Sequence, residues 1–352
     1  MVTEQTYSWP VVITSLIKGE DLSFEAAAWA MDRIFSGEAS PAQVAGFLTT
    51  LAAKGETVAE LRALADVMLS HARTIDVEGE TVDIVGTGGD FHQSVNISSM
   101  ASVIVAATGR RVVKHGNRAA SSKSGSADVL EALGINLTLT PDQVEQVAAD
   151  AGITFCFAQT FHPAMRHAAE ARRDLGVATA FNILGPLTNP ARPTYALIGC
   201  AKEPVAPIMA GVFADRGSDA VVFRGDDGLD ELTIATTSHL WWVAQGAITE
   251  HTLAPEDVGL TRHPLETLRG GDAVYNADVA RRVWAGETGP IRDAVVLNAG
   301  IALALADAKG TPVDDPIVAL RAGMDAAEET IDSGAATAQM ERWAQVSTAL
   351  GQ

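Results

Sequence analysis

The chain has 352 residues, of which 47% are hydrophobic and 20% are charged, so it is long enough for one large or two ordinary globular domains. Its 25 basic and 44 acidic residues give a net charge of −19, which disfavours nucleic acid and anionic membranes as partners. No apolar run reaches the ~18 residues that a membrane-spanning helix needs. We expect no secretory signal, because no basic region followed by an apolar stretch is seen at residues 1–9. The two cysteines, Cys156 and Cys200, lie in apolar runs typical of a protein core. We therefore expect a cytoplasmic protein.

Residues 1–75 predict helices, without the alternation of polar and apolar residues that is typical of strands. Ser40 is followed by Pro41 and Gln43, which is the pattern of a capping box with proline in the first helical position. Gly55 is placed to end that helix. Thr57 and Glu60 form a second capping box, so another helix should begin there.

From Thr81 onwards, short apolar segments that predict strands alternate with segments that predict helices. The expected strands are residues 82–85, 111–113, 153–158, 195–200 and 220–223. This alternation is typical of an α/β domain with a mainly parallel sheet. Residues 240–268 give mixed signals, and we predict no element type for them.

A glycine-rich turn follows the first expected strand. The sequence reads DIVGTGGD at 83–90, and VNISS follows at 95–99. Glycines allow backbone N–H groups to approach an anion closely, and a helix start adds further donors. The glycine spacing fits neither a Walker loop nor a dinucleotide-binding fingerprint. A tight turn without a ligand is the alternative interpretation, and Asp90 and Ser98 could be either ligands or helix caps.

A second polar segment, KHGNRAASSKSGSAD at 114–128, lies between an expected strand and an expected helix. It holds three Lys or Arg residues and four serines. We interpret it as a loop that wraps a multiply charged phosphate, and a solvated polar loop is the alternative. His115 alone would more often be an ordinary histidine than a catalyst.

A third segment, DDGLDE at 226–231, places four carboxylates in six residues after another expected strand. These charges repel one another unless they are solvated or share a cation. Mg²⁺ suits such oxygen ligands because it binds through one or two carboxylates plus substrate phosphate. An acidic surface turn is the alternative. All three segments follow strands, and the carboxyl ends of parallel strands form the ligand crevice of such sheets. We therefore expect the three segments to meet.

Seven motifs together resemble the signatures of the anthranilate phosphoribosyltransferase family, and they cover nearly the whole chain. They are GTGGD at 86–90, NISS at 96–99, KHGNRAASSKSGSAD at 114–128, HPAMRHAAEARRDLG at 162–176, FNILGPLTNPA at 181–191, DDGLDE at 226–231 and LRGGDAVYNA at 268–277. GTGGD alone is less specific, because pyrimidine nucleoside phosphorylases have a similar loop. A phosphorylase is therefore the nearest rival, whereas the net charge of −19 argues against a nucleic-acid-binding relative.

The resemblance implies a homodimer whose subunits each have two domains. It implies an α/β large domain with a mainly parallel central sheet, formed by residues 76–163 and 190–352. A small, discontinuous all-α domain would consist of residues 1–75 and 164–189. The implied substrates are phosphoribosyl pyrophosphate (PRPP) and anthranilate, with one or two Mg²⁺ ions per subunit.

The resemblance also implies the ligands of each substrate. PRPP would be held by Gly86, Gly89, Asp90, Ser94, Asn96, Ile97, Ser98, Ser99, Lys114, His115, Gly116, Asn117, Arg118, Ala119, Ala120, Ser121, Ser122 and Ser126. Anthranilate would contact Gly86, Asn117, Arg172, His115 and Arg173. Magnesium would be held by Ser98, Asp230 and Glu231. We assign no general base, because the aromatic amine of anthranilate is already neutral at pH 7.

The sequence departs from the family's pattern at four positions. Ser94 and Ser99 stand where threonine is usual, and both keep the hydroxyl group. Phe91 is bulky for the turn after GTGGD, and Ala178 stands where many relatives carry arginine. The reaction expected from the resemblance does not depend on the last two positions.

Overall fold

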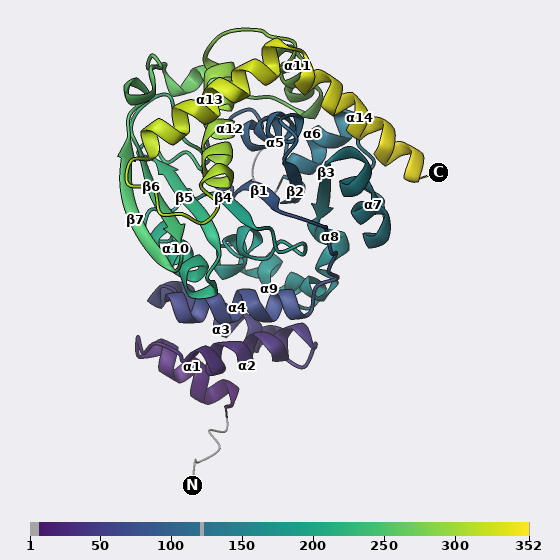
Figure 1. The fold of residues 1–352 in the computed structure, drawn as a ribbon. Helices are drawn as coiled ribbons and strands as arrows, with labels where there is room; N and C mark the ends of the chain where they lie inside the picture. The colour runs from purple at the N-terminus through teal and green to yellow at the C-terminus, as the bar shows by residue number, and fades with distance from the viewer. Residues whose placement is uncertain (1–6, 120–122, 352) are drawn as a thin grey trace.

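The computed structural model describes residues 7–119 and 123–351, and it begins with four helices at one end of the molecule (Figure 1). These are α1 (Trp9–Ile17), α2 (Phe24–Phe35), α3 (Pro41–Lys54) and α4 (Val58–Ser70). Both predicted capping boxes are confirmed. Gln43 N–H donates to Ser40 Oγ over 3.3 Å, and Glu60 N–H donates to Thr57 Oγ1 over the same distance.

A seven-stranded sheet forms the centre of the larger part, in the order β3-β2-β1-β4-β5-β6-β7. Its first five members in that order are parallel, so the prediction of a mainly parallel sheet is confirmed. The strands are β1 (Thr81–Gly86), β2 (Arg111–Gly116), β3 (Ile153–Phe157), β4 (Tyr195–Gly199), β5 (Asp219–Gly225), β6 (Ser238–Ala244) and β7 (Ala247–Leu253).

The region of mixed sequence signals contains a β-hairpin. Strand β6 pairs antiparallel with both β5 and β7. Gln245 and Gly246 connect β6 to β7, and both have positive φ angles, as the tightest hairpin turns require. Two short 3₁₀ turns follow at Pro255–Val258 and Leu265–Leu268, so short elements of different types succeed one another here.

The remaining helices lie around the sheet (Figure 1). Those from α5 to α10 lie between strands in the chain, and α11 to α14 follow the last strand. They are α5 (Ile97–Ala107), α6 (Ser126–Ala132), α7 (Pro141–Ala151), α8 (Ala158–Phe161), α9 (Arg166–Leu175), α10 (Ala206–Arg216), α11 (Ala273–Trp284), α12 (Pro290–Ala308), α13 (Pro316–Asp332) and α14 (Ala335–Leu350). No helix within the described ranges is long and apolar enough to cross a membrane. Cys156 and Cys200 are buried and unpaired, as expected.

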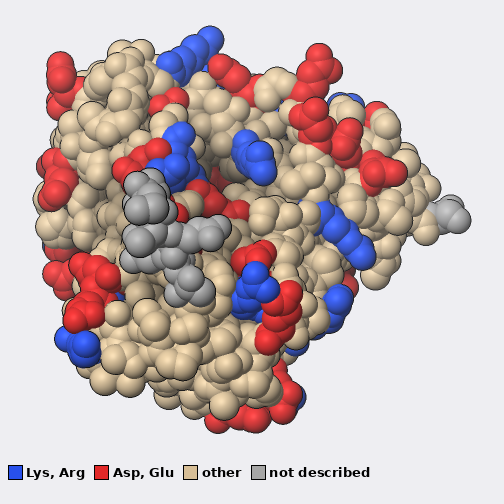
Figure 2. Space-filling model, turned by 90° about the horizontal axis from the view of Figure 1, so that it is seen from below, with Lys and Arg blue, Asp and Glu red and all other residues tan. Residues whose placement is uncertain are grey.

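Acidic side chains are spread over the face of the molecule in Figure 2, and Lys or Arg side chains lie beside them in several places. The net charge of −19 is therefore not gathered into one patch on this face. A broad area of the same face carries no charged side chain.

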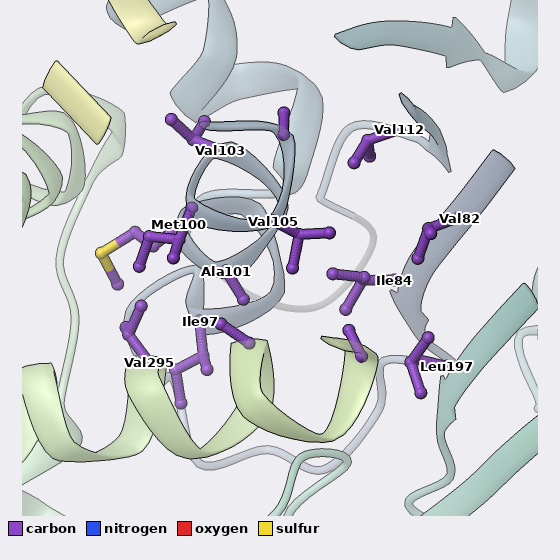
Figure 3. Close-up of a cluster of buried hydrophobic side chains, with 14 of the residues drawn as sticks. Val82, Ile84, Ile97, Met100, Ala101, Val103, Val105, Val112, Leu197 and Val295 are labelled. Atoms are coloured by element: carbon purple, nitrogen blue, oxygen red, sulfur yellow. The ribbon is translucent and has the colours of Figure 1, made fainter. Parts of the chain in front are cut away.

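One hydrophobic core lies between the sheet and the helices that include α5 and α12 (Figure 3). Ile97, Met100 and Val105 of α5 point into it, together with Ile84 of β1 and Val295 of α12. All five are buried, so α5 is anchored along its length against the strand that precedes it. This packing fixes where the first turn of α5 lies relative to the end of β1.

A second hydrophobic core joins α1–α4 to the opposite face of the sheet and to α10. Residues of the segment 164–187, among them Ala168 and Leu184, belong to the same core. The helical segment thus packs on the N-terminal helices although almost 100 residues separate them in sequence. The division into domains at 1–75 and 164–189 stays a prediction.

Candidate functional site

The acidic turn crosses the carboxyl ends of β1 and β4, and two glycines make room for it. A Cβ atom at Gly199 would lie 2.5 Å from the carbonyl carbon of Asp230, and one at Gly86 would lie 2.9 Å from its Cγ. The Asp230 carboxylate Oδ2 accepts a hydrogen bond from Gly88 N–H over 2.7 Å. The first and third predicted segments therefore meet, as the sequence indicated.

Glu231 connects the same turn to the start of α5. Its Oε1 accepts a hydrogen bond from Ser98 N–H over 3.1 Å. Lys114 Nζ lies 3.2 Å from Ser98 Oγ and also donates to the carbonyl of Ile84. Ser98 therefore contacts both charged groups: its hydroxyl group lies beside the buried Lys114 ammonium group, and its backbone N–H binds the Glu231 carboxylate.

Burial makes the carboxylates of this cluster hard to ionise. It raises the pKa of Asp230 to about 7, and the nearby Asp90 carboxylate adds to the effect. It likewise raises the pKa of Glu231 to about 8, with Asp230 as the next cause and Lys114 opposing. The pKa of Lys114 is lowered by burial, although three carboxylates oppose the shift. A bound cation would favour the ionised carboxylates.

The other two carboxylates of the acidic segment stabilise the turn itself. Asp227 accepts hydrogen bonds from Leu229 N–H and from Thr233 Oγ1, at 3.1 and 2.6 Å. Asp226 accepts one from Thr237 Oγ1 and pairs with His239. Asp226 and Asp227 are therefore occupied within the turn, and only Asp230 and Glu231 are left as predicted metal ligands. The first two carboxylates bind within the turn, and the last two, Asp230 and Glu231, lie in the cluster.

The cluster offers few protein ligands, which fits Mg²⁺ better than a metal whose ligands all come from the protein. Within residues 7–119 and 123–351, no three His, Cys, Asp or Glu side chains gather in a way that could hold a metal ion. The predicted ligands Asp230, Glu231 and Ser98 would supply two carboxylates and one hydroxyl oxygen. Mg²⁺ is typically held by one or two carboxylates, with waters and substrate phosphate completing the coordination shell.

The second predicted segment differs most from expectation, because its first three residues belong to a strand. Lys114, His115 and Gly116 lie at the end of β2, and Lys114 is only 1% exposed. A Cβ atom at Gly116 would lie 2.9 Å from the Phe155 ring, which fits close packing against β3. The prediction that these three residues belong to a loop is therefore wrong.

The part of the second segment that follows Gly116 is held by hydrogen bonds and ion pairs to residues of the segment itself and of α6. Arg118 pairs with Asp128 and Glu131, so its charge is already engaged. The Asp128 carboxylate also accepts hydrogen bonds from Ala119 N–H and Gly125 N–H, at 3.0 and 2.8 Å. The carbonyl of Asn117 accepts one from Ser126 Oγ over 3.3 Å. The predicted ligands Ala120, Ser121 and Ser122 lie outside the described residues.

His115 is a buried, neutral side chain that packs on a second histidine. Its Nδ1 bonds to the carbonyl of Gly185 over 2.9 Å, and its ring centroid lies 5.2 Å from that of His162. Burial, as the largest cause in each case, lowers the pKa of His115 to about 3 and that of His162 to about 4. Nε2 of His115 is buried and has no hydrogen-bond partner among the described residues.

Arg172 and Arg173 stand one after the other on α9 but have different surroundings. The Arg172 guanidinium lies 5.2 Å from the centroid of the Phe181 ring, and partial burial lowers its pKa. Arg173 is exposed and lies 3.3 Å from the carboxylate of Asp174. The structure therefore distinguishes the two arginines that the resemblance placed together.

The remaining predicted residues surround the glycine turn. Ile97 is buried in the core, so it could contact a ligand only through its backbone. The hydroxyl group of Ser99 is buried without a hydrogen-bond partner in the described chain, and Ser94 forms a bridge with Arg269. Phe91 has a φ of 62° and is 79% exposed, so the turn accommodates its bulk by directing the ring into solvent. Sequence reasoning did not find Gly199 and His162 as parts of this region.

Comparison with known proteins agrees with this geometry. Residues 10–72 match the helical bundle domain of a glycosyl transferase family, and residues 78–337 match its a/b domain. The chain is 60% identical to anthranilate phosphoribosyltransferase of Streptomyces avermitilis over 343 residues, which cover 97% of this chain and 96% of the relative.

Two solved structures of the same enzyme are also similar. The one from Thermus thermophilus is 41% identical with a TM-score of 0.88, and the match covers 96% of this chain and 99% of that one. The one from Saccharomyces cerevisiae, in complex with PRPP and Mg, is 26% identical with a TM-score of 0.87, covering 97% and 98%. The chain therefore belongs to the glycosyl transferase family and, within it, to the anthranilate phosphoribosyltransferases.

Proposed function

We propose that the chain transfers the 5-phosphoribosyl group of PRPP to the amine of anthranilate. The products are N-(5-phosphoribosyl)anthranilate and pyrophosphate, as in the second step of tryptophan synthesis from chorismate. The observation that carries this proposal is the meeting of Asp230 and Glu231 with the glycine turn and the start of α5, in a chain of this family.

The charges of the cluster call for a metal ion. When ionised, Asp90, Asp230 and Glu231 would carry three negative charges, against one positive charge on the Lys114 ammonium group. Such a site repels pyrophosphate unless a cation joins the two. Mg²⁺ held by Asp230, Glu231 and Ser98 would neutralise the charge that develops on the departing pyrophosphate. The use of magnesium is supported by the yeast relative described with PRPP and Mg. The number of ions stays a prediction.

Two of the amide groups in the glycine turn are already in use. Thr87 N–H donates to the carbonyl of Gly199 over 2.9 Å, and Gly88 N–H donates to Asp230. We therefore assign the turn two tasks: its first amides hold the acidic segment, and Gly89 and the residues after it would approach PRPP. Lys114 would act through Ser98 and by its charge, since its ammonium group is buried.

Anthranilate would bind between α9 and the end of β2. Arg172 would pair with its carboxylate, because that guanidinium is half-buried and has no ion pair among the described residues. The neutral His115 would offer an uncharged surface to the aromatic ring. In this arrangement Arg173, which pairs with Asp174, would have no direct part.

In the reaction, the nitrogen of anthranilate forms a bond to the anomeric carbon while the bond from that carbon to the pyrophosphate oxygen breaks. Bond breaking would run ahead, giving an oxocarbenium-like transition state and inversion at carbon. The amine nitrogen afterwards loses a proton to water. Because no strong base is needed, the residues would act by positioning the substrates and by electrostatic stabilisation of the leaving group.

A fluorescence assay tests the function. Anthranilate fluorescence should fall with time only when protein, PRPP and Mg²⁺ are all present, and pyrophosphate should appear in equal amounts. Cleavage of pyrimidine nucleosides by phosphate, without any use of PRPP, would instead identify a nucleoside phosphorylase and overturn the proposal.

We also propose that the chain acts as a homodimer. The support is the family, together with two exposed aliphatic side chains on α1: Val11 is 56% exposed and Ile17 is 69% exposed. Light scattering should give twice the mass of one chain, and a single-chain mass at micromolar concentration would refute the proposal. Location in the cytoplasm stays a prediction.

A further inference from the structure

The segment 268–277 lies beside the glycine turn, although more than 170 residues separate the two in sequence. Val95 N–H donates to the carbonyl of Leu268 over 2.9 Å, and Gly270 N–H donates to the carbonyl of Gln93 over 2.7 Å. A Cβ atom at Gly270 would lie 2.8 Å from the carbonyl oxygen of Ser94, so only glycine allows this approach. The two segments are therefore held together along their backbones.

Asn276, in the first turns of α11, connects this segment to a predicted PRPP ligand. Its side chain is buried, with the residue only 3% exposed. Asn276 Oδ1 accepts a hydrogen bond from Gly271 N–H over 2.8 Å, and Asn276 Nδ2 donates to Asn96 Oδ1 over 2.8 Å. Asn96 Nδ2 in turn donates to the carbonyl of Ser124 over 3.2 Å. Two side-chain amides thus link three segments of the chain.

The direction of this chain of hydrogen bonds is set by its two ends. A backbone N–H can only donate, so Asn276 must present its oxygen to Gly271. Its nitrogen then faces Asn96, which must present its own oxygen in return. The nitrogen of Asn96 is left to face the carbonyl of Ser124, which can only accept. Turning either amide would bring two acceptors or two donors together.

We propose that Asn276 is a positioning residue for the transferase reaction, acting through Asn96. It holds the Asn96 amide in one orientation and thereby fixes the second polar segment, at Ser124, relative to the glycine turn. This inference rests on the proposed function, in which Asn96 contacts PRPP. Asn276 itself touches no substrate, so its removal should weaken the use of PRPP and leave anthranilate recognition by Arg172 unchanged.

A double-mutant cycle tests this role. Asn276→Ala should lower kcat/KM for PRPP about tenfold, a loss of ~1.4 kcal/mol that lies within the usual range for one hydrogen bond, and the KM for anthranilate should stay within twofold. Asn96→Ala should lower kcat/KM for PRPP at least as much. The double variant should be no worse than Asn96→Ala, because one residue acts through the other. Effects that multiply in the double variant would overturn the proposal.

Asn276→Asp offers a test that keeps the shape of the side chain. The carboxylate still accepts from Gly271 N–H but cannot donate to Asn96, so the same loss in kcat/KM for PRPP is expected. A kcat/KM for PRPP equal to that of the wild type would overturn the inference. If Asn276→Ala does not fold, Asn276→Asp alone tests the positioning role. Asn136→Ala is a matched control, since Asn136 accepts hydrogen bonds from Thr138 and from no predicted ligand. If the wild-type protein itself fails to consume anthranilate, the proposed function fails instead.

Discussion

Gly199→Ala would place a methyl group against the main chain of the acidic turn. Its Cβ atom would lie 2.5 Å from the carbonyl carbon of Asp230, and the Asp230 Cα would be only 3.3 Å away. Carbon atoms pack at about 3.5–4.0 Å, so the turn would have to move by roughly 1 Å. The obstacle is backbone at the end of a paired strand, and it cannot rotate away as a flexible side chain would.

A movement of that size should lower the catalytic rate more than it lowers the stability of the fold. A misplacement of about 1 Å can lower the rate of an enzyme about 100-fold, which corresponds to ~2.7 kcal/mol of transition-state stabilisation. Overpacking in addition costs ~1–3 kcal/mol of folding free energy. We therefore expect Gly199→Ala to fold, with a reduced Tm, and to lose about two orders of magnitude in kcat at saturating PRPP and anthranilate.

The assay is the loss of anthranilate fluorescence at several Mg²⁺ concentrations, with thermal unfolding of the same samples. Gly46→Ala is the control, because its Cβ atom would meet only the end of the Ile13 side chain, at 3.2 Å, within the N-terminal helices. If Gly199→Ala kept more than half of the wild-type kcat while Gly46→Ala behaved as wild type, the idea that the position of Asp230 governs catalysis would be refuted.

Three further predictions concern charge. Arg172→Ala should raise the KM for anthranilate at least tenfold more than the KM for PRPP, and equal effects in steady-state kinetics would refute its pairing with the carboxylate. Mg²⁺ should bind more tightly as the pH rises from 6 to 8, because Asp230 and Glu231, with pKa values of about 7 and 8, must lose protons to bind it. Calorimetry should detect this proton release, and affinity that does not change with pH would contradict it. Because the folded pKa values of His115 and His162, about 3 and 4, lie below the ordinary value of 6.5, their neutral forms stabilise the fold above pH 6.5 and this contribution is lost as the pH falls towards 4. The Tm of His162→Gln should therefore fall less than that of the wild type between pH 7 and 5, and parallel Tm curves would count against the buried neutral pair.

Local signals explain what could be predicted from the sequence. The capping boxes at Ser40 and Thr57 join residues three positions apart, so they are visible in any window of a few residues. The glycine turn and the acidic segment are likewise continuous stretches, each after an apolar strand. Their meeting followed from the rule that parallel strands present their carboxyl ends at one edge of the sheet.

Contacts between distant segments explain what could not be predicted. Lys114 looked like a loop residue because it is charged, yet its ammonium group finds partners at Ile84 and Ser98 inside the fold. Gly199 ends a strand without any motif, and its importance appears only when Asp230 lies against it. His162 sits in a family motif, but only the fold brings its ring onto that of His115.

The central claim is that the carboxylates at the ends of β1 and β4 accept PRPP only together with magnesium. Calorimetric titration of the wild-type protein with PRPP at pH 8, with and without Mg²⁺, tests it most directly. Saturable binding should appear in the presence of Mg²⁺ and vanish in its absence, and Asp230→Asn combined with Glu231→Gln should abolish the difference. Binding of equal affinity with and without the metal in the wild type would contradict the account.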